Sequence, residues 1–195
     1  MTALLWETRK HLLVSDTVYK RFLRLPLRRV LEGPMAEAAA DAREWFAREA
    51  RPWGCAIATD PARWTLASAK TRGATALALV AVSTGVEVAE ETAARWARDE
   101  PDRAFFLDRL AAATVEVMLA AAKRELGSTY HDCPGFWDWP IQENSRLLSA
   151  LQAECPLPGP LDVLDSGMLR PKTSQLALCT LPARESAPTE ARVSR

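Results

Sequence analysis

The segment ATALALVAVS, at residues 74–83, constrains the fold most, because it is apolar at nearly every position. A membrane helix needs about 20 such residues, so this run is too short to span a bilayer. A short apolar run ended by Gly85 is instead typical of a buried strand. Residues 54–59 form a second apolar segment, which predicts another short strand.

The segments around these two strands have helical patterns. Residues 2–31 are predicted to be helical, with an apolar leucine face. Gly33-Pro34 begins a second helix, because proline suits the first helical turn, and Arg51-Pro52 ends it. Asp60-Pro61 is a capping signal for a third helix that ends at Gly73. Further helices are predicted at 87–99, 101–127 and 141–155, and strands at 161–164 and 174–181 on either side of a tight turn.

This order of helices and strands predicts an α+β fold. The 195 residues bound the chain to one domain, which we place at 1–182, with 1–73 as a helical N-terminal part. Residues 183–195 are polar without an apolar period, and we predict that they are disordered.

Charge and cysteine content narrow the classes of function. The 25 basic and 25 acidic residues cancel, which argues against nucleic acid or an anionic membrane as the main partner. The charged N-terminus does not resemble a secretory signal. The cysteines are far apart in the sequence, so we predict reduced thiols in a cytoplasmic protein. They are Cys55, Cys133, Cys155 and Cys179.

No metal site is predicted. The two histidines, His11 and His131, have no partner ligands at a zinc-binding spacing. Asp108 and Glu116 share one face of the long helix, and a solvated or capping role is predicted for both.

Trp137 and Trp139 flank Asp138 in a loop bounded by prolines. Aromatic side chains on an irregular segment with glycine and an acid can form the wall of a ligand site. A loop anchored by its own aromatic side chains explains the same pattern, and both interpretations stay open. Core or half-buried packing is expected for the other tryptophans, Trp6, Trp45, Trp53, Trp64 and Trp96.

Two ordered motifs carry a family resemblance. Residues 131–140 read HDCPGFWDWP, followed by Gln142, and residues 164–174 read LDSGMLRPKTS. Together they resemble the signature of the activation (reactivation) domain of cobalamin-dependent methionine synthase, the module that binds S-adenosylmethionine. Weaker similarities extend the resemblance over residues 74–181, including the segment from Phe106 to Glu116.

The resemblance implies a twisted antiparallel sheet with surrounding helices. It also implies a stand-alone module that binds S-adenosylmethionine and supplies a methyl group to cob(I)alamin on a partner corrinoid methyltransferase, as in a split methionine synthase. Cobalamin would come only with the partner, because the sequence has no Asp-x-His-x-x-Gly motif. The ligand-binding residues it implies are His131, Cys133, Pro134, Gly135, Phe136, Trp137, Trp139, Asp165, Ser166, Arg170, Lys172 and Ser174.

The sequence departs from the family pattern at two positions. His131 stands where relatives have an arginine that holds the ligand carboxylate, and Phe136 replaces a tyrosine. Histidine is mostly neutral at pH 7 and offers one donor, whereas arginine is always charged. Arg170 and Lys172 are the natural candidates to compensate.

Two alternatives to the reactivation module stay open. The first is a repurposed enzyme that catalyses displacement, cyclisation or elimination at the sulfonium, or transfer to a small acceptor, with His131 or Asp132 as base. The chain would then be a lyase, cyclase or transferase acting on S-adenosylmethionine. The second is a scaffold protein that has lost the ligand.

Overall fold

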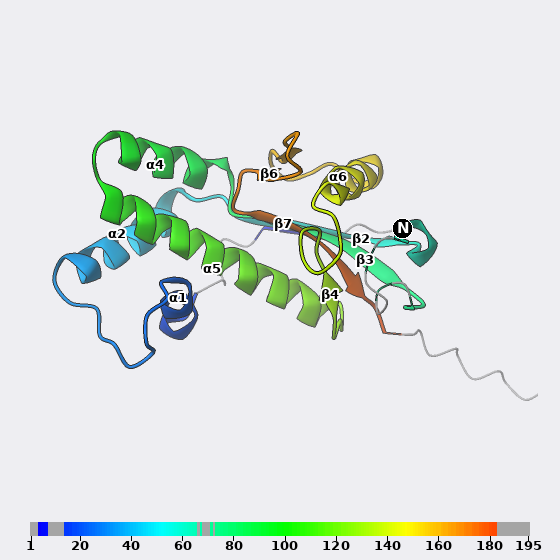
Figure 1. The fold of residues 1–195 in the computed structure, drawn as a ribbon, viewed down its shortest axis with the longest axis horizontal. Helices are drawn as coiled ribbons and strands as arrows, with labels where there is room; N and C mark the ends of the chain where they lie inside the picture. Colours follow the sequence, from blue (N-terminus) through cyan, green and yellow to red (C-terminus); the bar gives the residue numbers. More distant parts are fainter. Residues whose placement is uncertain (1–3, 8–13, 66, 68–70, 72, 183–195) are drawn as a thin grey trace, which may run out of the picture.

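The core of the structure, a computed structural model, is a five-stranded antiparallel sheet (Figure 1). The residues described are 4–7, 14–65, 67, 71 and 73–182. In spatial order the strands are β1 (Leu4–Glu7), β2 (Trp53–Thr59), β3 (Leu77–Ser83), β7 (Ser174–Thr180) and β4 (His131–Asp132). The central strand β3 is buried along its whole length, which confirms the buried strand predicted from the apolar run.

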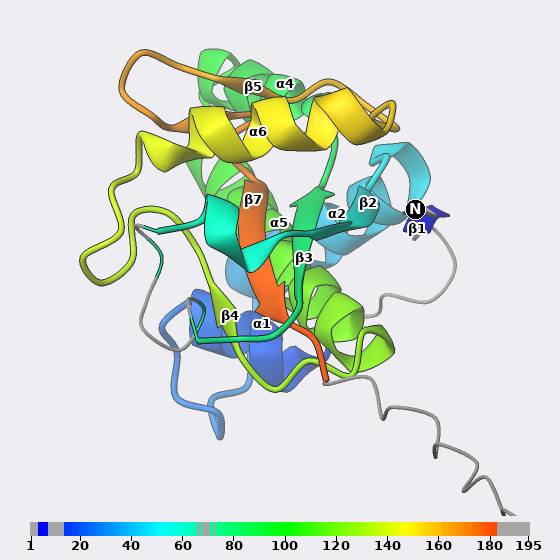
Figure 2. The ribbon, with the colours of Figure 1, turned by 90° about the vertical axis from the view of Figure 1, so that its right-hand side faces the viewer.

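Helices cover both faces of the sheet. The 25-residue helix α5 (Pro101–Glu125) lies along one face, and α6 (Glu143–Glu154) runs across the strands on the other (Figure 2). A small hairpin of β5 (Asp162–Val163) and β6 (Leu169–Arg170) lies on the same side as α6. The α+β class predicted from the sequence is therefore confirmed.

The two faces of the sheet are packed with side chains of different size. Along β7, Leu176 and Leu178 point into the core beneath α6, whereas Ala177 and Cys179 point toward α5. Such alternation follows from the two-residue period of a strand. The small residues on the α5 side leave room for the long helix to lie close to the backbone of the sheet.

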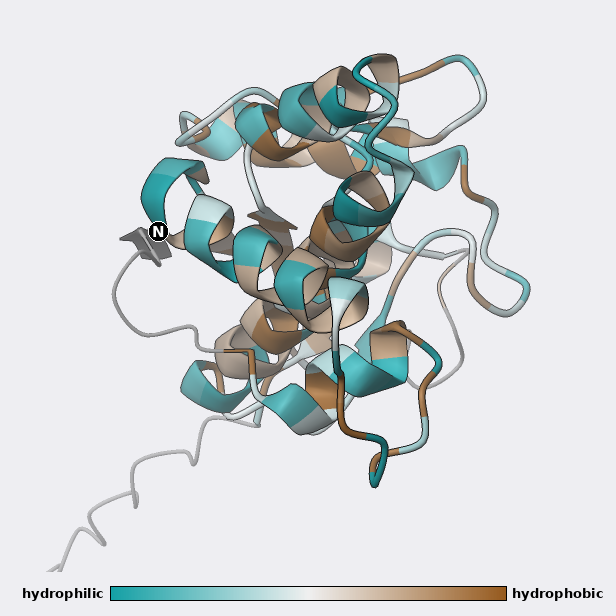
Figure 3. Ribbon diagram, turned by 90° about the vertical axis from the view of Figure 1, so that its left-hand side faces the viewer, coloured by the Kyte–Doolittle hydropathy of each residue, from teal (hydrophilic) through white to brown (hydrophobic). Residues whose placement is uncertain are grey.

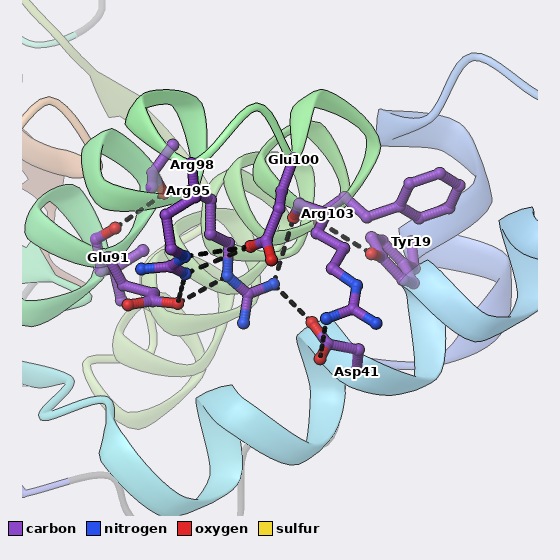
Figure 4. A network of polar contacts seen from close by, with 10 residues as sticks. Tyr19, Asp41, Glu91, Arg95, Arg98, Glu100 and Arg103 are labelled. Carbon is purple, nitrogen blue, oxygen red and sulfur yellow. Dashed lines mark hydrogen bonds and ion pairs between the residues drawn. The ribbon is translucent and has the colours of Figure 1, made fainter.

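A separate helical cluster surrounds the N-terminal part of α5. It consists of α1 (Asp16–Phe22), α2 (Pro34–Glu49) and α4 (Val86–Ala97), along which hydrophilic and hydrophobic residues alternate (Figure 3). A buried guanidinium joins α4 to α2, because Arg95 of α4 contacts Asp41 of α2 at 2.5 Å and also Glu91 of its own helix at 2.7 Å (Figure 4).

Two helix predictions were wrong in part. Leu4–Glu7 is a strand, because its backbone pairs with the edge of β2, where Leu4 lies opposite Ala56. Tertiary pairing thus overrides the helical pattern at these four residues. Among the described residues of the predicted range, the helix is α1 (Asp16–Phe22), and residues 8–13 lie outside the described part. The helix expected from Asp60 to Gly73 begins as a 3-10 turn at Pro61–Arg63; of the later residues Thr71 is helical, and 66, 68–70 and 72 lie outside the described residues.

Both strands predicted near the C-terminus are present, at 161–164 as the shorter β5 and at 174–181 as β7. They belong to different sheets, because β5 pairs with β6 and β7 lies in the main sheet. The segment expected to be irregular, 128–140, contains the short edge strand β4. The tail at 183–195, predicted to be disordered, lies outside the described residues.

Candidate functional site

The two motifs meet because β4 and β7 are antiparallel neighbours. His131 lies opposite Cys179, and Asp132 lies opposite Leu178. The chain that leaves β4 therefore runs alongside the beginning of β7, where the second motif ends. A cavity of about 270 Å³ lies at this point. Its lining residues are Cys133, Pro134, Phe136, Ile141, Asn144, Met168, Leu169, Lys172, Ser174, Gln175 and Leu176.

The first wall of the cavity is a compact loop closed by its own backbone. The N–H of Gly135 donates to the carbonyl of Trp139 at 2.8 Å, and the N–H of Trp139 donates to Phe136 at 3.1 Å. Gly135 has a φ of +87°, which glycine adopts without the strain a side chain would bring. The turn leaves the side chains of Phe136 and Trp137 exposed.

The opposite wall is the turn between β5 and β6. The N–H of Leu164 donates to the carbonyl of Met168 at 2.9 Å, and Gly167 occupies the turn with a φ of +83°. The buried side chain of Asn144 donates from Nδ2 to the carbonyl of Gly167 at 3.0 Å. Helix α6 thus holds this turn, and with it the cavity wall, in place.

Charged residues of α5 form a cluster with Lys172 at the edge of the cavity. The Nζ of Lys172 lies 2.5 Å from one oxygen of Asp108, and Arg109 donates to the other oxygen at 2.6 Å. The Asp108 side chain is only 12% exposed, so the solvated or capping role predicted for it was wrong. Its face of α5 is turned toward the second motif. Two cations share one carboxylate, which leaves the cluster with a net positive charge.

Five of the residues implied by the resemblance line the cavity, and the others do not. Trp139 is packed in the core beneath α6, and Trp137 projects into solvent. Arg170 is exposed and forms an ion pair with Asp162 at 3.7 Å within the β5–β6 hairpin. Gly135 lies in the loop turn, and Asp165 and Ser166 are exposed in the β5–β6 turn. The five that line it are Cys133, Pro134, Phe136, Lys172 and Ser174.

The two residues proposed as bases lie on β4, outside the set of lining residues. Burial lowers the pKa of the His131 imidazole, and the charge of Lys123 lowers it further, so the ring is uncharged at neutral pH. The negative charges of Glu116 and Asp132 act to raise the pKa of His131, but by less than burial and Lys123 lower it. Asp132 is buried and accepts a hydrogen bond from the Thr71 hydroxyl at 3.3 Å.

Sequence reasoning missed several lining residues. Asn144 had a usable signal, since it is a polar residue on the face of α6 that also carries the buried Leu147 and Leu148. Gln175 directly follows the second motif, and Met168 lies within it. Ile141, Leu169 and Leu176 have no distinguishing signal, because apolar residues of this kind also fill the core.

Cys133 is expected to resist alkylation. Burial raises the pKa of its thiol to about 12, and it outweighs the hydrogen bond that Gln175 Nε2 donates to the sulfur at 3.0 Å, which acts to lower that pKa. Because the thiolate is the nucleophile, iodoacetamide should leave Cys133 unmodified in the folded protein at pH 7.5 and modify it in denaturant. Peptide mass spectrometry measures this directly. Rapid labelling of the folded protein at neutral pH would show that the thiol is ionised or exposed.

Two larger hollows lie away from both motifs. One, of about 450 Å³, is formed by the beginnings of β2 and α4 and by a Pro-Gly-Pro turn at 158–160. The other, also about 450 Å³, lies between α2 and α4 and is rich in glutamate. Within the described residues no group of three or more potential ligands could hold a metal ion, and none of the helices there is long and apolar enough to cross a membrane.

A solved structure has the same arrangement of helices and sheet. The crystal structure of the MetH reactivation domain bound to AdoHcy matches with a TM-score of 0.69, covering 96% of this chain and 80% of that one. The chain has the reactivation-domain fold. Sequence identity is 13%, so the similarity shows the fold alone. No protein-family model matches the sequence, and no curated protein is significantly similar to it.

Proposed function

We propose that this chain binds S-adenosylmethionine in the cavity between the two motifs and presents its methyl group to cob(I)alamin on a partner corrinoid methyltransferase. The observation that carries the proposal is that both motifs of the resemblance, at residues 131–140 and 164–174, line a single cavity. The related fold of a domain that binds AdoHcy supports it.

The residues present suit such a ligand. S-adenosylmethionine combines a charged amino-acid group, a polar ribose and a flat adenine. The cavity offers the ammonium of Lys172 together with the hydroxyl and amide groups of Ser174, Gln175 and Asn144. Its remaining walls are apolar, as is usual for small-molecule sites. When bound, S-adenosylmethionine supplies its sulfonium methyl group, and S-adenosylhomocysteine is left behind.

The size of the cavity supports transfer to a partner. Its volume of about 270 Å³ is below the range of roughly 300–1,000 Å³ found for sites that enclose a ligand of this size. Part of the ligand would therefore stay accessible from outside. Phe136 and Met168, which line the cavity, have exposed side chains, as does the neighbouring Trp137. Exposed apolar side chains beside the ligand are available for contact with a protein partner.

The repurposed enzyme is less well supported. An elimination, or a displacement by a nucleophile that must lose a proton, needs a base within hydrogen-bonding reach of the reacting group. The neutral imidazole of His131 is suited to that role chemically, but neither His131 nor Asp132 lines the cavity. The chain's contribution to methyl transfer is to bind and orient the ligand, for which no base is required.

Methyl transfer can be measured with the purified chain, methyl-labelled S-adenosylmethionine, free cobalamin and a strong one-electron reductant. We expect label to appear on the corrinoid, faster than in the same mixture without protein, and S-adenosylmethionine to remain intact when cobalamin is omitted. Consumption of S-adenosylmethionine without cobalamin would favour the repurposed enzyme. No protein-dependent labelling under either condition would contradict the proposal.

A further inference from the structure

We infer that Lys172, in the second motif, binds the carboxylate of the ligand. It would replace the arginine that relatives have in the first motif, at the position of His131. This inference rests on the proposed binding of S-adenosylmethionine and deepens it. Lys172 is the one charged side chain among the described residues that line the cavity.

The geometry around Lys172 suits an anion. Its ammonium has three N–H donors, and the contact with Asp108 at 2.5 Å uses one of them. Because the Lys172 side chain is 58% exposed, the other donors are accessible to a ligand. Arg109 donates to the same carboxylate. Because the single negative charge of Asp108 is shared between two cations, it does not fully neutralise Lys172. Asp108 is therefore a positioning residue that holds the ammonium beside the cavity.

The competing cations are less suitable. Arg170 is directed to Asp162, on the hairpin, and does not line the cavity. His131 lies on β4, also outside the lining, and carries no charge at neutral pH. An ammonium is a compact charge without the fixed fork of a guanidinium, so the site should select a carboxylate by charge more than by bidentate geometry.

The test compares S-adenosylmethionine with its decarboxylated analogue, which lacks only the carboxylate, by calorimetric titration. We expect the wild-type chain to bind S-adenosylmethionine about 10- to 150-fold more tightly, the usual effect of one charge-assisted hydrogen bond. Lys172→Met should bind both ligands alike, and Lys172→Arg should restore the preference. Lys20→Met, which removes the same charge from α1, is the matched control and should keep the wild-type preference.

The ratio of the two affinities within each variant is the decisive quantity, because a general loss of stability affects both ligands equally. A preference that survives in Lys172→Met would overturn the inference and leave the proposed function standing. Loss of the preference in Arg170→Met alone would overturn it as well and assign the carboxylate to Arg170. A wild-type chain that binds neither ligand would overturn the proposed function and this inference together.

Discussion

Replacing Trp139 with alanine is expected to lower the free energy of unfolding by about 3–5 kcal/mol, the usual cost of removing a buried aromatic side chain. Trp139 is 3% exposed and packs in the core beneath α6. Chemical denaturation followed by circular dichroism measures the change. Trp139→Phe should cost far less, because the indole N–H of Trp139 is buried without an acceptor in the described part of the chain.

Trp137 provides the control in the same loop. Its side chain is 89% exposed, so Trp137→Ala should change stability by no more than about 0.5 kcal/mol. The pair therefore distinguishes a loop anchored by Trp139 from a loop whose two tryptophans both face a ligand. Equal and small effects of the two alanine variants would contradict the packing described here.

Replacing Arg95 with alanine is expected to cost about 3–5 kcal/mol, because it leaves the carboxylates of Asp41 and Glu91 without their buried partner. The Arg95 side chain is 4% exposed and joins α4 to α2. Its guanidinium also donates to the carbonyl of Arg103 at 3.3 Å, which extends the network to α5 (Figure 4). Thermal or denaturant unfolding should show the loss.

Arg98 is the matched control for Arg95. It also forms an ion pair with Glu91, at 3.1 Å, but its side chain is 50% exposed. Exposed ion pairs contribute about 0–1 kcal/mol, so Arg98→Ala should have a small effect. Comparable losses in the two variants would show that burial of the Arg95 guanidinium is not what stabilises the helical cluster.

The elements predicted best from the sequence are those with an unambiguous local pattern. The apolar run at 74–83 contains β3, and the long helix opened by Pro101 ends within two residues of Gly127. Elements that depend on distant partners were missed. Leu4–Glu7 becomes a strand because the edge of β2 is available, and the two-residue strand β4 exists because β7 lies beside it.

The same distinction applies to the candidate site. The motifs indicated both walls of the cavity, but spacing along a chain does not show which side chains point inward. Trp139 directly follows Asp138 in the same loop as Trp137, yet its side chain is packed in the core. Asp108 has the sequence pattern of a surface residue, but in the folded chain its side chain is mostly buried against Lys172. Antiparallel pairing of β4 with β7 brings the motifs together. The local sequence of neither strand predicts that pairing, because the partners are far apart in the chain.

Binding of S-adenosylmethionine to the cavity is the central claim, and calorimetric titration of the purified chain without cobalamin tests it most directly. We predict saturable binding with a dissociation constant in the micromolar range. Binding should be weakened in Lys172→Met and unchanged in Lys20→Met. The absence of any heat of binding to the folded wild-type chain would contradict the claim.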